Sequence, residues 1–153
     1  MIRVEGRGTM HESTAAKNVA LQTLRADENA TVVFDLSACE YLDSTFLGCI
    51  AEMFRSYGRT NPPRFQVAAG AQRHAALFGA CRMDKVINAV DPAPPVHGEW
   101  VVIPACKAEP GELTRHVIAC HKALAEIDSP MRESFAKLAA RLERELVADD
   151  DNE

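Results

Sequence analysis

Residues 31–50 read TVVFDLSACEYLDSTFLGCI, and this stretch decides the fold. It opens with a β-branched, apolar run from Thr31 to Leu36, which is typical of a short buried strand. A polar turn then leads to Asp43, Ser44 and Thr45, and apolar residues recur at helical spacing after them. The pattern predicts a strand, a loop and a helix whose first turn carries one carboxylate and two hydroxyls.

The start of this predicted helix has two interpretations. A helix N-terminus has unpaired backbone N–H groups and a partial positive charge, so it can hold a phosphate on Ser44 or Thr45. A phosphate there would change a binding surface. In the other interpretation Asp43 and Ser44 only cap the helix, as these residue types commonly do. The local pattern leaves both open.

Strands and helices alternate on both sides of this stretch. Period-two and helical apolar patterns follow one another, and prolines and glycines separate them. The expected strands lie at 2–5, 31–36, 64–69 and 86–90, and the expected helices at 13–24, 44–57 and 72–77. Such alternation favours an α/β fold in which helices pack on a sheet with parallel pairs.

Residues 1–91 resemble the STAS domain family, the domain of bacterial anti-sigma factor antagonists. Members of this family have an apolar strand ending in Asp-Leu, a short loop, and Asp-Ser-Ser or Asp-Ser-Thr followed by Gly-Leu-Gly at the head of a helix. The corresponding segments here are VVFDL at 32–36, Tyr41-Leu42, Asp43-Ser44-Thr45 and Leu47-Gly48, with further similarity at 2–7, 64–69 and 77–87. The resemblance implies an α/β (α+β) STAS fold, a small mixed sheet with helices packed on it.

The resemblance also implies a function without enzymatic activity. In that family the unphosphorylated domain binds an anti-sigma factor that is also a serine kinase, and so regulates transcription in a bacterial signalling pathway. The kinase ends this binding by phosphorylating the motif serine, and a phosphatase restores it. Carried over, Ser44 is the phosphorylation site with Thr45 in reserve, and the surface that binds the protein partner is formed by Asp43, Ser44, Thr45 and Phe46.

Two features qualify this expectation. Phe46 stands where the family usually has Gly, and it is either an exposed anchor for a partner or a buried packing residue. The alternative function is a STAS scaffold or ligand-sensing module of a signalling complex, in which Ser44 is not phosphorylated and only caps its helix.

The composition excludes several other classes. The chain has 153 residues and a formal charge of −5 without a basic stripe, so nucleic acid is not an expected partner. No apolar run reaches the length of a membrane span, and the first residues do not have the form of a signal peptide, so we expect no membrane partner and a cytoplasmic location. Five cysteines without a CxxC pair indicate reduced thiols.

Motifs for catalysis or cofactors are weak. The chain contains no P-loop, dinucleotide fingerprint, GxSxG or HExxH sequence, and we expect no cofactor and no catalytic residues. His116, Cys120 and His121 are residue types that bind zinc. However, Cys120 falls on an apolar helix stripe and His121 lies about 100° round the helix from it, so no metal site is predicted. A small enzyme built on Cys, His and Asp would need a reactive thiol.

The chain changes character after residue 91. We expect a Pro-rich linker at 92–110 with a possible edge strand at Glu99–Ile103, a helical hairpin at 111–148 and an acidic tail at 149–153. Ser129 and Pro130 predict the start of the second helix of the hairpin. Its two apolar stripes are formed by Leu113, Val117, Cys120, Leu124 and Ile127, and by Met131, Phe135, Leu138, Leu142 and Leu146. These stripes pack within the chain, on a partner, or in a homodimer through the C-terminal helices.

Overall fold

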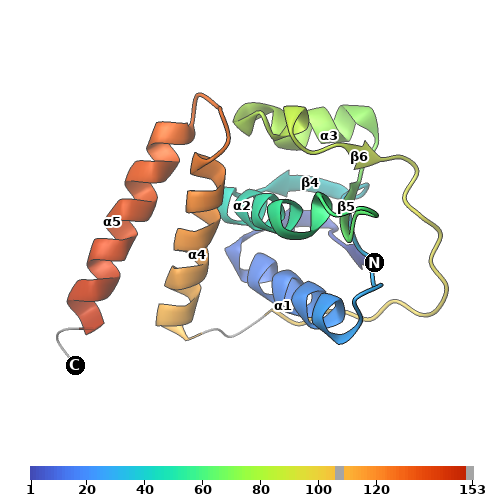
Figure 1. Cartoon of the computed structure of the whole chain (residues 1–153), viewed down its shortest axis with the longest axis horizontal. Coiled ribbons are helices and arrows are strands. Elements are labelled where there is room, and N and C mark those ends of the chain that lie inside the picture. The colour runs from blue at the N-terminus through green and yellow to red at the C-terminus, as the bar shows by residue number, and fades with distance from the viewer. Residues whose placement is uncertain (106–108, 151–153) are drawn as a thin grey trace.

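The predicted alternation of strands and helices folds into a mixed α/β structure with small parallel sheets (Figure 1). The computed structural model describes residues 1–105 and 109–150. Its elements are β1 (Ile2–Arg3), β2 (Gly6–Gly8), α1 (Met10–Ala26), β3 (Val32–Asp35), β4 (Cys39–Leu42), α2 (Ser44–Met53), the π-turn η1 (Phe54–Gly58), β5 (Phe65–Ala68), α3 (Ala71–Phe78), the 3₁₀ turns η2 (Gly79–Cys81) and η3 (Met83–Lys85), β6 (Ala89–Val90), α4 (Pro110–Ala125) and α5 (Arg132–Asp150).

The larger sheet has the strand order β1-β3-β5-β6, and all its pairings are parallel. Ile2 lies opposite Phe34, and Val32 lies opposite Phe65. Strand β3 is buried along its whole length, as its β-branched sequence predicts. The expectation of a mixed sheet is wrong for the described residues, because all the strand pairings in both sheets are parallel.

A second sheet was not predicted from the sequence. Strand β2 pairs in parallel with β4, which occupies part of the segment expected to be a loop. Its register shifts between Gly6 and Arg7, and Gly6 has a φ of +66°, a conformation that favours glycine. This sheet carries the chain directly to the start of α2, because β4 ends at Leu42, one residue before Asp43.

The hydrophobic core lies between the sheet and its helices and is built around aromatic rings. Phe34 meets Phe46 and Phe65 edge to face, with ring centroids 6.2 and 5.1 Å apart. All three side chains are fully buried or nearly so. Edge-to-face rings add to the stabilisation that burial of their area already provides.

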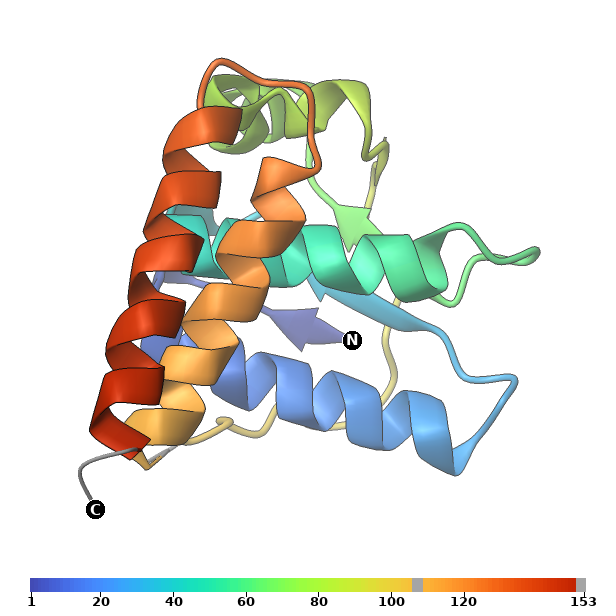
Figure 2. The ribbon, with the colours of Figure 1, turned by 60° about the vertical axis from the view of Figure 1, so that its left-hand side comes forward.

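The C-terminal residues form the expected helical hairpin, and it packs within the chain. Helix α4 lies between α2 and α5, and it crosses the N-terminal ends of α1 and α2 (Figure 2). Arg55 in η1, which follows α2, and Glu126 after α4 form an ion pair at 2.5 Å. Whether the exposed side of the hairpin also joins two chains stays a prediction.

Several details of the C-terminal expectations are wrong. Residues 99–103 form no strand, and Val102 is 92% exposed. Met131 and Leu138 are exposed, because the buried face of α5 passes through Phe135 and Ala139 instead. Helix α5 begins three residues after Ser129 and continues into the predicted tail, to residue 150.

The predicted linker and tail are only partly described, since residues 106–108 and 151–153 lie outside the described part of the chain. In residues 1–105 and 109–150, no helix combines the length and the apolar character that crossing a bilayer requires.

Candidate functional site

Asp43 is the N-cap of α2 and also serves α1. Its Oδ1 accepts the backbone N–H of Phe46 at 2.8 Å, which is the capping bond expected of an Asp at this position. Its Oδ2 accepts the backbone N–H of Met10, the first residue of α1, also at 2.8 Å. The capping interpretation of Asp43 is therefore confirmed, and one carboxylate satisfies two helix N-termini.

Ser44 is the first residue of α2, and its hydroxyl contacts the C-terminal hairpin. Its Oγ lies 3.0 Å from Nε2 of His121 in α4. The other ring nitrogen of His121, Nδ1, lies 2.8 Å from the carbonyl oxygen of Val117. A carbonyl only accepts, so Nδ1 donates to Val117, and in the tautomer with its hydrogen on Nδ1 the Nε2 atom accepts the hydroxyl of Ser44.

The Ser44 and His121 pair has the hydrogen bond of a nucleophile and its base, but its imidazole is buried and its hydroxyl is only partly exposed. His121 is only 3% exposed, and the ring of Phe135 covers it with centroids 5.7 Å apart. A substrate therefore has no route to the imidazole while α4 and α5 are in place. The arrangement anchors α4 to the start of α2.

Thr45 and Phe46 are buried, so of the predicted partner surface only Asp43 and Ser44 are partly exposed. The Phe46 ring packs in the core, where a Cβ added to Gly8 would lie 2.8 Å from its Cδ2. The packing interpretation of Phe46 is thus confirmed. The Phe46 ring occupies the space beside Gly8, which has no side chain, so a large ring at position 46 contributes to the packing.

A second Ser–His pair ties α4 to α1. The Oγ of Ser13 lies 2.9 Å from Nε2 of His116 and 2.9 Å from the carbonyl oxygen of Met10. Burial lowers the pKa of His116 to about 4, and the nearby Lys17 adds to this effect. The imidazole is therefore neutral near pH 7, and it forms part of the contact between two helices.

The closest approach of α4 to α2 is at Gly48. A Cβ at this position would lie 2.2 Å from the carbonyl oxygen of Cys120, so the two helices meet backbone to backbone. The Cys120 side chain is fully buried, and burial raises its pKa; burial raises the pKa of the neighbouring Cys49 to about 12. Both thiols are protonated near pH 7 and unsuited to nucleophilic attack while covered.

The sequence did not predict the contacts of His116 and His121 with Ser13 and Ser44, because these histidines were weighed only as zinc ligands and no metal site was predicted. In the described ranges no three His, Cys, Asp or Glu side chains gather as a metal ion would require. The useful signal was the apolar position of Cys120. Helix α4 packs on both α2 and α5, so it buries its apolar stripe and also the residues beside that stripe. His121 is one of these residues, and it faces α2.

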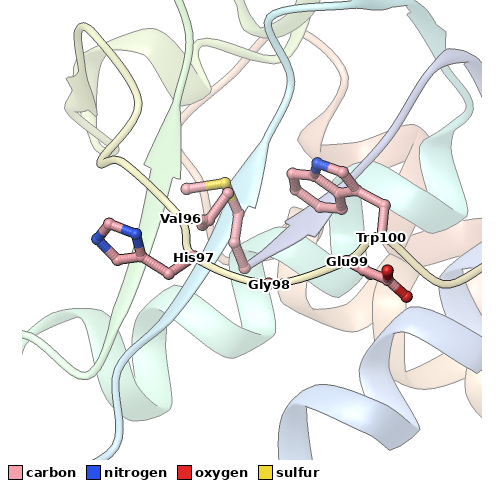
Figure 3. A pocket seen from close by; sticks show the side chains of 6 residues that line it. Val96, His97, Gly98, Glu99 and Trp100 are labelled. Carbon is pink, nitrogen blue, oxygen red and sulfur yellow. The ribbon is translucent and has the colours of Figure 1, made fainter.

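One cavity of about 130 Å³ lies where the linker passes β1 (Figure 3). It is smaller than the roughly 300–1,000 Å³ of small-molecule sites. Its lining comes from Met1, Val96, His97, Gly98, Glu99 and Trp100. The indole of Trp100 packs against the guanidinium of Arg3, whose Cζ lies 4.4 Å from the ring centroid.

Comparison with models of known protein families finds no match for this chain, and comparison with curated proteins finds none either.

Proposed function

We propose that the chain is a protein-binding module of the anti-sigma factor antagonist type, regulated by phosphorylation of Ser44. Its partner is an anti-sigma factor with serine kinase activity, and a phosphatase reverses the modification. The kinase transfers the γ-phosphoryl group of ATP to Ser44 Oγ, the hydroxyl proton passes to a base of the kinase, and ADP leaves. Hydrolysis by the phosphatase then returns the hydroxyl and releases inorganic phosphate.

The observation that carries the proposal is the position of the Ser44 hydroxyl, at the first residue of α2 and in contact with His121 of another segment. The N–H groups and positive end of a helix stabilise a phosphate placed there. The same phosphate adds roughly −1.5 to −2 charges beside Asp43. One modification therefore changes both the charge of the surface and its contact with α4, which is what a switch requires.

The direct test is intact-mass and phosphopeptide analysis of the protein isolated from its own cells under several growth conditions. We expect phosphate on Ser44 whose amount depends on the condition. Absence of phosphate from both Ser44 and Thr45 in all conditions would reject the switch.

A second test compares partner binding by variants. Ser44→Ala keeps the unmodified charge, whereas Ser44→Asp imitates part of the phosphate charge. We expect Ser44→Ala to retain a partner that Ser44→Asp loses. Ser134→Asp makes the same substitution at an exposed position of α5 and should bind like the unsubstituted chain.

The second candidate is a constitutive scaffold or ligand-sensing module of a signalling complex. It is favoured by the hydrogen bond between Ser44 and His121, which gives the hydroxyl a structural role without any phosphate. In that case Ser44→Ala and Ser44→Asp bind the same partners equally well once both are folded.

A further inference from the structure

We propose that the α4–α5 hairpin is a displaceable cover over the face of α2 that carries Ser44, and that partner and kinase reach this face only after the hairpin moves away. What binds the uncovered face rests on the proposed function. The opening is a property of the chain alone and is tested separately.

The docked hairpin occupies part of the space that a phosphate on Ser44 would take. Phosphoryl transfer needs the attacking oxygen in line with the leaving group, with space for the phosphate around it. In the closed form the imidazole of His121 lies 3.0 Å from Ser44 Oγ, where that space would be needed. One turn along α2, Gly48 is covered by the backbone of Cys120. Ser44 itself is partly exposed, but Gly48 is buried under α4, so a partner reaches the whole face only after α4 leaves.

The contact between α4 and the N-terminal unit (residues 1–90) places Cys120 and Leu124 in the main hydrophobic core, and it also has a polar component that water can replace. Two of its hydrogen bonds join side chains, Ser13 with His116 and Ser44 with His121. The ion pair of Arg55 and Glu126 lies at its exposed edge. Opening exchanges these bonds for bonds with water, so each costs much less than its strength in isolation. Interfaces that separate within a chain are commonly of this mixed kind.

The hairpin can move as a unit because α5 packs on α4 and not primarily on the sheet. Phe135 of α5 covers the ring of His121, and Lys122 of α4 forms an ion pair with Glu143 of α5. These contacts lie within the hairpin and survive its departure. The connection to β6 is long: the described part, residues 91–105, contains no helix or strand and is mostly exposed.

The cover gives the switch a defined direction. In the unmodified chain a closed form exchanges with an open form, and the partner binds α2 in the open form. The hairpin thus competes with the partner for the same face. Once Ser44 is phosphorylated, α4 no longer fits over it, and the added charge beside Asp43 repels the partner from the uncovered helix.

The native thiols measure the opening directly. Cys120 lies on the covered face of α4, whereas Cys39 is buried within the N-terminal unit. The protein is exposed to an alkylating reagent under native conditions, and peptide mass spectrometry gives the rate at each thiol. If the hairpin opens by itself, Cys120 reacts at least about ten times faster than Cys39, which needs a larger unfolding.

Variants then test the role of Ser44. Ser44→Asp should raise the rate at Cys120 roughly tenfold and leave Cys39 unchanged, because it removes the bond to His121 and adds charge. His121→Ala should also raise the alkylation rate at Cys120. Ser134→Asp and His11→Ala make the matched changes at exposed positions and should leave the Cys120 rate as in the unsubstituted chain.

Equal rates at Cys120 and Cys39 in the unsubstituted chain would overturn the cover, since the hairpin would then open only with the whole molecule. An unchanged Cys120 rate in folded Ser44→Asp and His121→Ala would also overturn it. Neither result depends on phosphate in the cell. A fast Cys120 together with an unmodified Ser44 would instead reject the proposed function and retain the cover.

Discussion

The Oδ2 of Asp43 accepts the backbone N–H of Met10 at 2.8 Å, which joins the cap of α2 to the first residue of α1. The other carboxylate oxygen of Asp43 caps α2 itself through Phe46. The two helices that α4 crosses therefore begin at one shared side chain. Asp43 fixes the relative position of the two helix starts, on which both Ser–His contacts with α4 depend.

Asp43→Ala is expected to lower the free energy of unfolding by about 1–3 kcal/mol, since each lost cap costs about 0.5–2 kcal/mol. The free energy of unfolding of Asp43→Asn should lie between those of the unsubstituted chain and Asp43→Ala, because an amide has only one acceptor oxygen. Chemical denaturation measures the loss, and hydrogen exchange should show faster exchange at both Met10 and Phe46. The control is Asp27→Ala, which removes a single exposed turn bond to Asn29. Equal losses for Asp43→Ala and Asp27→Ala would contradict the double cap.

Gly48→Ala is expected to destabilise the protein although alanine is the better helix former by about 1 kcal/mol. The new Cβ would lie 2.2 Å from the carbonyl oxygen of Cys120, and overpacking of this kind costs about 1–3 kcal/mol. Gly79→Ala is the matched control, because its φ of −61° is helical and nothing lies within 4 Å of its added Cβ. It should be neutral or stabilising by up to about 1 kcal/mol in thermal or urea unfolding. A stabilising Gly48→Ala would show that the helices separate at no cost.

Stability should fall as the pH drops from about 6.5 towards 4, owing to His116. Its pKa is lowered to about 4 in the folded chain from the ordinary value near 6.5, mainly by burial. Between these values the unfolded chain binds more protons at this site, so protonation favours unfolding, and the contribution levels off below the folded pKa. The groups near the ring are Lys17 of α1, which lowers the pKa, and Glu52 and Asp43, which raise it.

The measurement is the free energy of unfolding at several pH values for the unsubstituted chain and His116→Gln. The difference between the two should shrink or reverse as the pH falls through this window. His11→Gln, at an exposed position of α1, should follow the unsubstituted chain. Parallel curves for the unsubstituted chain and His116→Gln would assign the acid sensitivity to other groups.

Arg3→Ala is expected to destabilise the sheet by about 2–4 kcal/mol, because it leaves the buried Asp35 without its charged partner. Burial alone would raise the pKa of Asp35, but hydrogen bonds from Ser37 and from Arg3, at 2.8 Å, hold it below the usual value. The expected loss is smaller than for a fully buried ion pair, because the Arg3 side chain is 35% exposed.

Trp100 provides the readout, since it is the only tryptophan of the chain and packs on Arg3. Its fluorescence should change in folded Arg3→Ala. Arg7→Ala removes an equivalent contact with Tyr41 and should affect neither the fluorescence nor, beyond about 0.5 kcal/mol, the stability. A similar loss for both variants would mean that Asp35 finds another partner.

Local patterns were sufficient for most of the N-terminal fold. The apolar run at 32–35, the helix from Ser44 and the strand at 65–68 all follow from periodicity and capping residues. Strand β4 was missed because Cys39–Leu42 pairs with the very short β2, and a partner so far along the chain leaves no local signal. Propensity describes a segment, whereas a sheet depends on which segments meet.

The same limit applies to the site. The motif predicted that Asp43 caps a helix, and it placed Ser44 at the first turn, where the structure has it. The contact with His121 spans 77 residues of sequence and depends on how α4 docks. Nothing in the spacing of His116, Cys120 and His121 specifies that docking. Helical periodicity indicates which stripe of α4 is apolar and does not reveal that α2 and α5 cover it from two sides.

The long separation between Ser44 and His121 also has a consequence during synthesis. The ribosome makes the N-terminal unit first, and His121 follows Ser44 by 77 residues. At roughly 5–20 residues per second, α4 emerges about 4–15 s after the start of α2. During that interval the nascent chain presents Ser44 and Gly48 without a cover. Each new molecule is therefore open to cellular proteins once, before its own C-terminal helices arrive.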